Sequence, residues 1–208
     1  MGKQGFGVLL ADPPWRWENW NSAARAERGE QWARRNGRSP YDVLDTNTIC
    51  ALPVQPLCAR NCVLLLWATF PKLPDALEVM SAWGFKYRTG LPWLKMTAAA
   101  APRIGLGFHL RSCSELLLIG TRGHPGVPAP ADRLPGVMFC PIHEHSQKPD
   151  YQYEIAEGYP GPWLELFARP RDGLFGPRPG WTQIGEGVDG LEIRDALQTL
   201  AAAKGGAQ

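Results

Sequence analysis

The feature that most restricts the possible folds is an unbroken apolar run at residues 62–69, Cys-Val-Leu-Leu-Leu-Trp-Ala-Thr. A continuous run of this kind is typical of a strand that is covered on both faces, so it predicts a strand in the middle of a sheet. A second run, Phe6-Gly-Val-Leu-Leu-Ala11, stops abruptly at Asp-Pro-Pro. It predicts a buried strand that ends in a loop, with Asp12 at its carboxyl end.

Helical patterns lie between further strand patterns. Leu73, Leu77 and Met80 recur at helical spacing, while Pro74 suits a first turn and Gly84 suits the end of the helix. We expect further strands at residues 85–95, 115–120 and 163–168, helices at 149–157 and through Ile193, Leu197 and Leu200, and a loop at 122–136. This alternation predicts an α/β fold with a mostly parallel central sheet and helices on both faces. Ligands of such folds bind outside the carboxyl ends of the strands.

The length of the chain suits one hydrophobic core. Two domains in 208 residues would each bury little surface, so we expect a single domain over residues 1–208. No run approaches the ~20 apolar residues that span a bilayer, which predicts a soluble protein without membrane contact. The five cysteines include no Cys-x-x-Cys pair, and no apolar signal segment opens the chain. These features favour reduced thiols and a cytoplasmic location.

Residues 16–40 lack a sustained periodic pattern and predict a long arginine-rich loop. They hold six arginines against three glutamates, a local excess of positive charge in a chain whose net charge is +2. The arginines alternate with tryptophans, a combination that suits a phosphate backbone with splayed bases. We therefore expect nucleic-acid contacts from Arg25, Arg28, Arg34 and Arg35. The alternative is a solvated, partly helical insertion.

The run Asp12-Pro13-Pro14-Trp15 suggests a specific chemistry. The lone pair of an adenine amine is delocalised into the ring, so the amine attacks a methyl sulfonium poorly unless two acceptors hold its hydrogens. The Asp12 carboxylate supplies one acceptor, and a carbonyl of the stiff proline turn supplies the other. Trp15 can stack on a base that has left its strand or duplex. The alternative is a proline-rich strand exit, with Asp12 bound to local backbone and Trp15 simply buried.

Seven short motifs occur in the order seen in one known family. They are Leu10-Ala-Asp-Pro-Pro-Trp15, Ser39-Pro-Tyr-Asp-Val43, Leu64-Leu-Leu-Trp67, Trp83-Gly-Phe85, Glu115-Leu-Leu-Leu-Ile-Gly120, His145-Ser-Gln-Lys-Pro-Asp150 and Glu165-Leu-Phe-Ala-Arg169. With them the chain resembles the MT-A70 family of S-adenosylmethionine-dependent N6-adenine methyltransferases, and its bacterial and phage branch in particular. The resemblance implies a Rossmann-like methyltransferase fold and methyl transfer to the N6 amine of adenine in nucleic acid, with DNA favoured over RNA.

The resemblance also implies roles for single residues. Asp12 would contact both the target amine and the methionyl end of S-adenosylmethionine, Pro13 and Pro14 would shape the acceptor turn, and Trp15 would stack on the base. Tyr41 resembles the aromatic residue that borders the substrate pocket.

Three further residues resemble cofactor contacts. Lys148 resembles the lysine that pairs with the cofactor carboxylate, a role suited to a compact point charge. Glu165 and Arg169 resemble residues that flank the cofactor at the end of its strand. From the residues themselves, the alternatives are that Lys148 is a charged residue at a helix start, that Glu165 is on the exposed side of a strand, and that Arg169 is at an exposed strand end.

Some features depart from the family pattern or favour other functions. Gly185-Glu186-Gly187 stands where relatives tend to have Gly-Asn, which puts a ribose contact by Glu186 in doubt. His143 and His145 flank an acidic residue, but no third ligand is evident, so we expect no metal. The competing functions are a catalytically inactive partner subunit or nucleic-acid-binding platform, and a small-molecule methyltransferase. An oligomer is compatible with the sequence.

Overall fold

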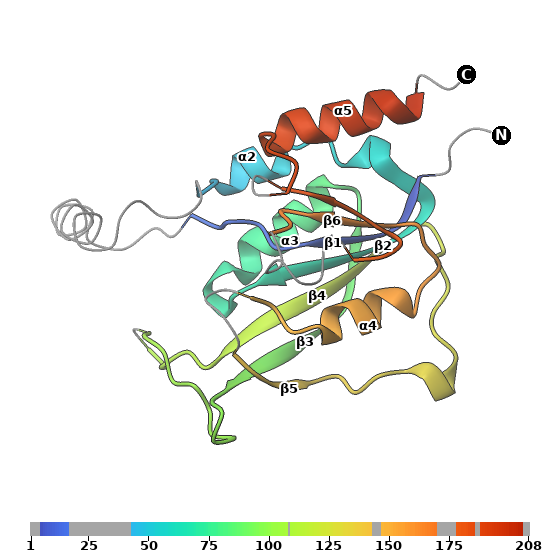
Figure 1. Cartoon of the computed structure of the whole chain (residues 1–208). Coiled ribbons are helices and arrows are strands. Elements are labelled where there is room, and N and C mark those ends of the chain that lie inside the picture. The colour runs from blue at the N-terminus through green and yellow to red at the C-terminus, as the bar shows by residue number, and fades with distance from the viewer. Residues whose placement is uncertain are drawn as a thin grey trace, which may run out of the picture.

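A computed structural model describes residues 5–16, 43–107, 109–142, 147–169, 178–185 and 188–205. Within them, seven strands form one sheet in the order β5-β3-β4-β2-β1-β6-β7 (Figure 1). The strands are β1 (Phe6–Ala11), β2 (Cys58–Ala68), β3 (Lys86–Met96), β4 (Ser114–Arg122), β5 (Met138–Pro141), β6 (Trp163–Leu166) and β7 (Trp181–Ile184). The helices are α2 (Thr46–Cys50), α3 (Leu73–Ala82), α4 (Tyr151–Glu157) and α5 (Ile193–Gly205), with short 3-10 turns at Gln55–Leu57, Phe70–Lys72 and Pro130–Asp132.

The predicted mostly parallel sheet is confirmed, with one reversed strand. β1 pairs in parallel with β2 and β6, β6 with β7, and β3 with β5. β4 runs antiparallel to both of its neighbours, β2 and β3. The carboxyl ends of the six parallel strands therefore share one edge of the sheet with the amino end of β4. We call this edge the carboxyl edge.

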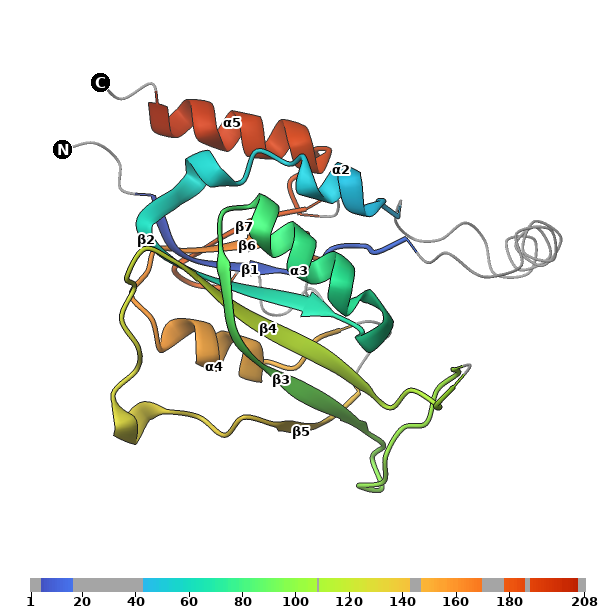
Figure 2. The ribbon, with the colours of Figure 1, turned by 180° about the vertical axis from the view of Figure 1, so that it is seen from behind.

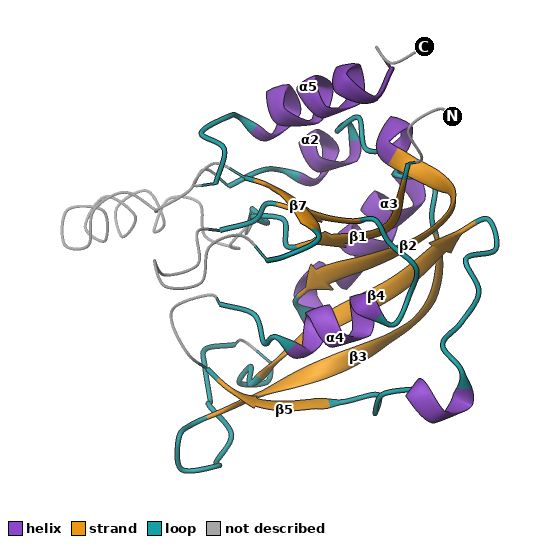
Figure 3. Ribbon diagram, turned by 45° about the vertical axis from the view of Figure 1, so that its right-hand side comes forward, coloured by secondary structure: helices purple, strands orange, loops and turns teal. Residues whose placement is uncertain are grey.

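Helices cover both faces of the sheet, as the sequence predicts. One hydrophobic cluster packs α2, α3 and α5 against Leu9, Leu64 and Leu164. Figure 2 shows α3 lying across this face, with α2 and α5 beside it. The second cluster packs α4 against Val8, Leu65 and other residues on the opposite face (Figure 3). Because consecutive residues of β1 and β2 enter different clusters, both strands are buried on both faces.

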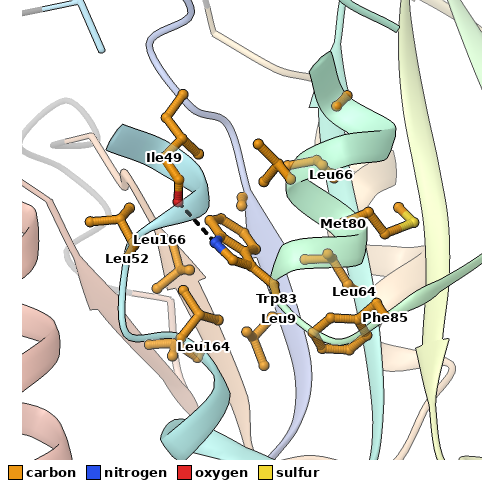
Figure 4. Packing of buried hydrophobic residues seen from close by; sticks show 14 of the residues in the cluster. Leu9, Ile49, Leu52, Leu64, Leu66, Met80, Trp83, Phe85, Leu164 and Leu166 are labelled. Atoms are coloured by element: carbon orange, nitrogen blue, oxygen red, sulfur yellow. Dashed lines mark hydrogen bonds between the residues drawn. The ribbon is translucent and has the colours of Figure 1, made fainter. Parts of the chain in front are cut away.

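Trp83 connects the first helical layer to the sheet. Its indole is fully buried, and its Nε1 donates to the carbonyl oxygen of Ile49 at 2.9 Å. Figure 4 shows the ring lying among Leu9, Leu164 and their neighbours, with its nitrogen directed at α2. A buried indole needs such an acceptor, and this hydrogen bond joins the end of α3 to α2.

The boundaries and some minor elements differ from the sequence prediction. The central strand begins at Cys58, four residues before the apolar run, because its first residues lie at the partly exposed edge of the sheet. Leu77 is 37% exposed, and the buried stripe of α3 consists of Ala76, Val79 and Met80. Three short elements, α2, β5 and β7, were not predicted.

None of the described helices is long and apolar enough to cross a bilayer.

Candidate active site

The carboxyl edge brings together charged residues from distant parts of the chain. Asp12 directly follows β1, Lys95 lies near the end of β3, and Glu115 lies at the start of the reversed strand β4. Lys148 comes from the segment between β5 and α4. This is the edge at which ligands of open α/β sheets bind.

The proline turn after β1 has a defined backbone conformation. The Trp15 amide donates to the Pro13 carbonyl at 2.9 Å, and the Leu44 amide donates to the Pro14 carbonyl at the same distance. A carbonyl oxygen has two lone pairs, so each of these carbonyls can accept a second hydrogen bond. A role for either carbonyl as an acceptor of a substrate amine stays a prediction.

Trp15 is more buried than expected for a side chain that only stacks on a substrate base. Its side chain is 9% exposed and belongs to the hydrophobic cluster on the α3 side of the sheet. Its Nε1 donates to the carbonyl oxygen of Trp67 at 3.0 Å. The residue anchors the turn to β2, and stacking on a base stays a prediction.

Asp12, Lys148, Glu115 and Lys95 form a chain of alternating charges. Lys148 Nζ lies 2.7 Å from Asp12 Oδ2 and 3.3 Å from Glu115 Oε2. Glu115 Oε1 in turn accepts from Lys95. The side chain of Lys148 is only 11% exposed, so its charge is compensated by carboxylates rather than by water.

The pKa values of Lys148 and Glu115 move in the directions that favour the charged forms. Burial alone would lower the pKa of Lys148, but the carboxylates of Asp12 and Glu115 outweigh burial and raise it above its usual value. Burial would likewise raise the pKa of Glu115, but the charges of Lys148 and Lys95 outweigh burial and lower it. Both groups are therefore ionised at neutral pH.

The ammonium groups of both lysines lie over indole rings. Lys148 Nζ lies 5.4 Å from the centroid of the Trp67 ring, and Lys95 Nζ lies 5.2 Å from that of Trp93. Both are cation–π distances. Trp67 Nε1 donates to Gln152 Oε1 at 2.7 Å, which orients the ring under Lys148.

Glu165 lies in a second polar cluster on the α4 face. Its carboxylate accepts from Tyr153 Oη at 3.0 and 3.1 Å and from Gln183 Nε2 at 2.6 Å. The guanidinium of Arg178 lies 4.5 Å from the Tyr153 ring and also binds Glu157. The backbone amide of Arg178 donates to Gln183 Oε1 at 3.2 Å, which closes a ring of contacts around Glu165.

Backbone strain marks the end of β6, beside this cluster. Phe167 has φ 60°, a left-handed conformation that is costly for a residue with a side chain. Gly185, which follows β7, lies close to Ala168, the residue after Phe167. A Cβ on Gly185 would lie only 2.2 Å from the Ala168 carbonyl oxygen. The chain thus bends sharply where β6 reaches the carboxyl edge.

The predicted site residues fall into three groups. The structure joins Asp12 directly to Lys148, on the proline turn that Pro13, Pro14 and Trp15 form. Glu165 and Arg169 lie at the end of β6. The predicted substrate contacts Tyr41, Arg25, Arg28, Arg34 and Arg35 lie outside the described residues, as do His143, His145 and Glu186. In the part of the chain that the structure describes, no group of three acidic, histidine or cysteine side chains could hold a metal ion.

Sequence reasoning missed Glu115, Lys95, Tyr153 and Gln183 as members of these clusters. A charged residue at the start of the apolar run 115–120 was a weak signal. This signal becomes informative only when β4 is known to run antiparallel to its neighbours. In a parallel strand, Glu115 would lie at the edge of the sheet opposite the carboxyl edge.

The MT-A70 family profile matches residues 6–187. The chain is 27% identical to N(6)-adenosine-methyltransferase MT-A70-like of Arabidopsis thaliana over 90% of this chain and 24% of that protein. It is 24% identical to the type II methyltransferase M.MunI of Mycoplasma sp. over 81% of this chain and 74% of that protein. It is 25% identical to human N(6)-adenine-specific methyltransferase METTL4 over 89% of this chain and 38% of that protein.

The lengths of these relatives differ greatly. The chain spans 24–28% of the length of the plant proteins that it matches, and most of the length of M.MunI.

Proposed function

The chain belongs to the MT-A70 family, and we propose that it transfers a methyl group from S-adenosylmethionine to the N6 amine of adenine in nucleic acid. The observation that carries the proposal is the contact between Asp12 of the proline turn and Lys148 at the carboxyl edge. It joins the residue proposed to hold the amine to the residue proposed to hold the cofactor. The relatives named above are adenine or adenosine N6 methyltransferases or a type II methyltransferase by name.

The charges at the carboxyl edge fit the methionyl end of S-adenosylmethionine, which carries one ammonium and one carboxylate. Lys148 can bind the cofactor carboxylate while Asp12 accepts from the ammonium. The present partners of Lys148 are themselves carboxylates, so the lysine exchanges one anionic partner for another and stays charged. When bound, the cofactor supplies an electrophilic methyl group on a sulfonium.

The proline turn can hold the target amine. The ion pair uses Asp12 Oδ2, so Oδ1 can accept one amine hydrogen, and the second lone pair of the Pro13 or Pro14 carbonyl can accept the other. Acceptors that are oriented before the reaction stabilise the positive charge that develops on the nitrogen. In the transfer, the nitrogen would bond to the methyl carbon as the carbon–sulfur bond breaks, and the methylated nitrogen would give one of its protons to water, while Asp12 and the proline carbonyl keep the amine oriented.

Glu165 suits the hydroxyls of the cofactor ribose. Tyr153 and Gln183 hold its carboxylate in one orientation at the end of β6, and an oriented carboxylate is a strong acceptor for hydroxyl donors. Arg169, three residues after β6 ends, is proposed to flank the cofactor at the same edge.

The nucleic-acid side of the site is proposed from the sequence. Tyr41 would border the target base, and Arg25, Arg28, Arg34 and Arg35 would contact phosphates. We expect DNA rather than RNA, because the chain resembles the bacterial and phage branch and matches most of the length of M.MunI.

One experiment identifies both the polymer and the atom. The purified protein is incubated with tritiated S-adenosylmethionine and with matched pools of DNA and RNA, and the digested nucleosides are separated. The expected product is N6-methyldeoxyadenosine from DNA. The Asp12→Asn variant is the negative control for contaminating methyltransferases, and Asp132→Asn, in the 3-10 turn Pro130–Asp132, is its matched control. If neither polymer is labelled, the function as an inactive partner subunit replaces this proposal.

A further inference from the structure

The connection between β3 and β4, residues 97–113, extends from the carboxyl edge. Figure 1 shows it, in yellow-green, projecting beyond the ends of both strands. It contains a tight turn in which the Thr97 amide donates to the Ala101 carbonyl at 2.8 Å. Beyond this turn, the Gly105 amide donates to the Ser112 carbonyl at 2.6 Å, and Arg111 Nε donates to the Gly105 carbonyl at 3.3 Å. We call the described residues 103–107 and 109–112 the β3–β4 arm.

The arm exposes apolar side chains. Leu106 is 92% exposed, Leu110 is 86% exposed, and Ile104 is also exposed. Single exposed leucines are ordinary, but three apolar residues close together on one projecting arm are typical of an interaction site.

The charge of the arm indicates the kind of partner. Arg103, His109 and Arg111 are exposed beside the leucines, and residues 97–113 contain no aspartate or glutamate. An apolar tip between two arginines is complementary to a base stack between two phosphates.

The base of the arm belongs to the candidate active site. The Lys95 amide donates to the Cys113 carbonyl at 2.8 Å, and the Arg103 amide donates to the Lys95 carbonyl at 2.7 Å. Lys95 itself pairs with Glu115, the partner of Lys148. Leu110 is five residues from Glu115 and Leu106 is three residues from Arg103, whose amide binds the Lys95 carbonyl, so these spans are at most about 17 Å and about 10 Å in an extended chain. The leucines therefore lie within reach of nucleotides that flank a base held at Asp12.

We propose that the β3–β4 arm inserts Leu106 and Leu110 into the base stack beside the target adenine, while Arg103 and Arg111 contact the flanking phosphates. The proposal rests on the proposed function and names the surface that prepares its substrate. A base in a duplex must leave the stack to reach the carboxyl edge, and that opening has a free-energy cost. Apolar wedges in other DNA-binding proteins unstack base steps by insertion.

The first test removes the wedge and keeps the charge. The Leu106→Ser/Leu110→Ser double variant and wild type are compared on sheared DNA, used either native or heat-denatured, with tritiated S-adenosylmethionine. We expect the variant to lose about tenfold or more on native DNA and to stay within about twofold of wild type on denatured DNA, where little opening is needed. An equal loss on both substrates, or no loss, would overturn the proposal. Val127→Ser is the matched control, because Val127 is 74% exposed on the segment between β4 and β5, whose two ends lie at the opposite edge.

A second measurement separates this proposal from the proposed function. Binding of each protein to a fluorescein-labelled 30-base-pair duplex is measured by anisotropy without cofactor, so catalysis does not enter. Weaker binding by the double variant, with wild-type binding by Val127→Ser, supports the arm even if the wild type methylates nothing. Unchanged binding contradicts the arm even if the wild type is active.

The proposed phosphate contacts of Arg103 and Arg111 are tested by the salt dependence of DNA binding. Arg103→Gln/Arg111→Gln should lower the slope of log binding constant against log salt by about two, since each phosphate contact contributes about 0.9 on duplex DNA. Lys86→Gln, at the exposed opposite end of β3, should leave the slope unchanged. An unchanged slope in the arginine variant would overturn the proposed phosphate contacts. A wild-type dimer that light scattering shows to dissociate in Leu106→Ser/Leu110→Ser would assign the arm to a second copy of the chain instead.

Discussion

At the scale of single residues, the ion pair of Asp12 and Lys148 links two residues whose proposed roles in methyl transfer differ. Asp12 is proposed to act on the amine as charge develops, whereas Lys148 is proposed to act on a cofactor carboxylate that does not change during the reaction. Their contact at 2.7 Å means that a change in either residue disturbs the other. The two roles can still be separated by comparing turnover with cofactor affinity.

Asp12→Asn should lower turnover by about 10²-fold or more, because an amide offers one acceptor oxygen where a carboxylate offers two. Lys148→Ala should instead weaken cofactor affinity more than turnover, since its interaction is made equally in the ground and transition states. Calorimetric cofactor titrations and steady-state kinetics on both variants measure this difference, with Lys86→Ala as a control at the opposite edge. Near-normal turnover by Asp12→Asn at saturating cofactor would refute its catalytic role.

Tyr153→Phe tests the ring of contacts around Glu165. The variant keeps the aromatic packing but removes the hydroxyl that donates to the carboxylate. We expect the KM for S-adenosylmethionine to rise about tenfold, the scale of a lost hydrogen bond to a charged group, with kcat within about threefold of wild type. Tyr151→Phe is the matched control, because Tyr151 lies on the same helix as Tyr153 and its hydroxyl donates to the Pro135 carbonyl rather than to Glu165. Equal KM values for the two variants would show that Tyr153 does not position Glu165.

Asp12 and Lys148, which the structure brings into contact, could be singled out from the sequence because their signals are local. Asp12 to Trp15 are consecutive, and Lys148 is followed by a proline in a short motif. Glu115 gave only a weak signal and Gln183 gave none, because their contacts with Lys148 and Glu165 depend on how β4 and β7 pair with their neighbours. A residue whose role depends on strand register or direction cannot be assigned before the sheet is known.

At the scale of elements, the end of α3 shows how a local sequence signal becomes a defined structure. Gly84 has φ +81°, the Gly84 amide donates to the Ser81 carbonyl, and the Phe85 amide donates to the Met80 carbonyl. These two bonds are those of a Schellman motif, whose glycine position tolerates other residues poorly.

Gly84→Ala should therefore destabilise the protein by about 1 kcal/mol or more, because an alanine at this φ clashes with its own backbone. Urea denaturation measures the change. Gly136→Ala is the control, since Gly136 lacks positive φ and a Cβ there would meet no atom within 4 Å. Similar midpoints for both variants would contradict the motif's contribution.

The arginine-rich segment 16–40 carries a prediction that belongs to this scale. Replacing Arg25, Arg28, Arg34 and Arg35 with alanine should weaken DNA binding and lower the salt slope by up to about four, if each contacts one phosphate. Arg60→Ala, at the exposed start of β2, serves as the control for loss of positive charge elsewhere. A slope equal to that of wild type would remove the segment from the interface.

The elements that sequence reasoning recovered are those with long apolar patterns. β1, β2, α3 and α5 have runs or periodicities that identify them. β5 and β7 have four residues each and α2 has five, which is too short for a period to emerge. The reversal of β4 was also missed, although residues 97–113 between β3 and β4 carry no helical pattern and so offered no parallel crossover.

At the scale of the whole molecule, the central strands couple the two hydrophobic clusters. β1 and β2 contribute residues to both, so neither cluster can lose its packing without exposing the strands of the other. We therefore propose that residues 1–208 form a single domain. Far-UV and near-UV circular dichroism should show coincident urea transitions, as expected of two-state unfolding. Two separated transitions would indicate that one helical layer unfolds independently.

The contact between Lys148 and the Trp67 ring should make the intrinsic fluorescence of this protein sensitive to cofactor binding. The buried indole lies 5.4 Å from a cation that is proposed to change partners when the cofactor carboxylate arrives. Because the emission of an indole responds to a nearby charge, cofactor binding should alter the intrinsic fluorescence of the protein without any attached dye. Trp67→Phe would remove that response, so the residue that supports the lysine would also report, in real time, when the site is filled.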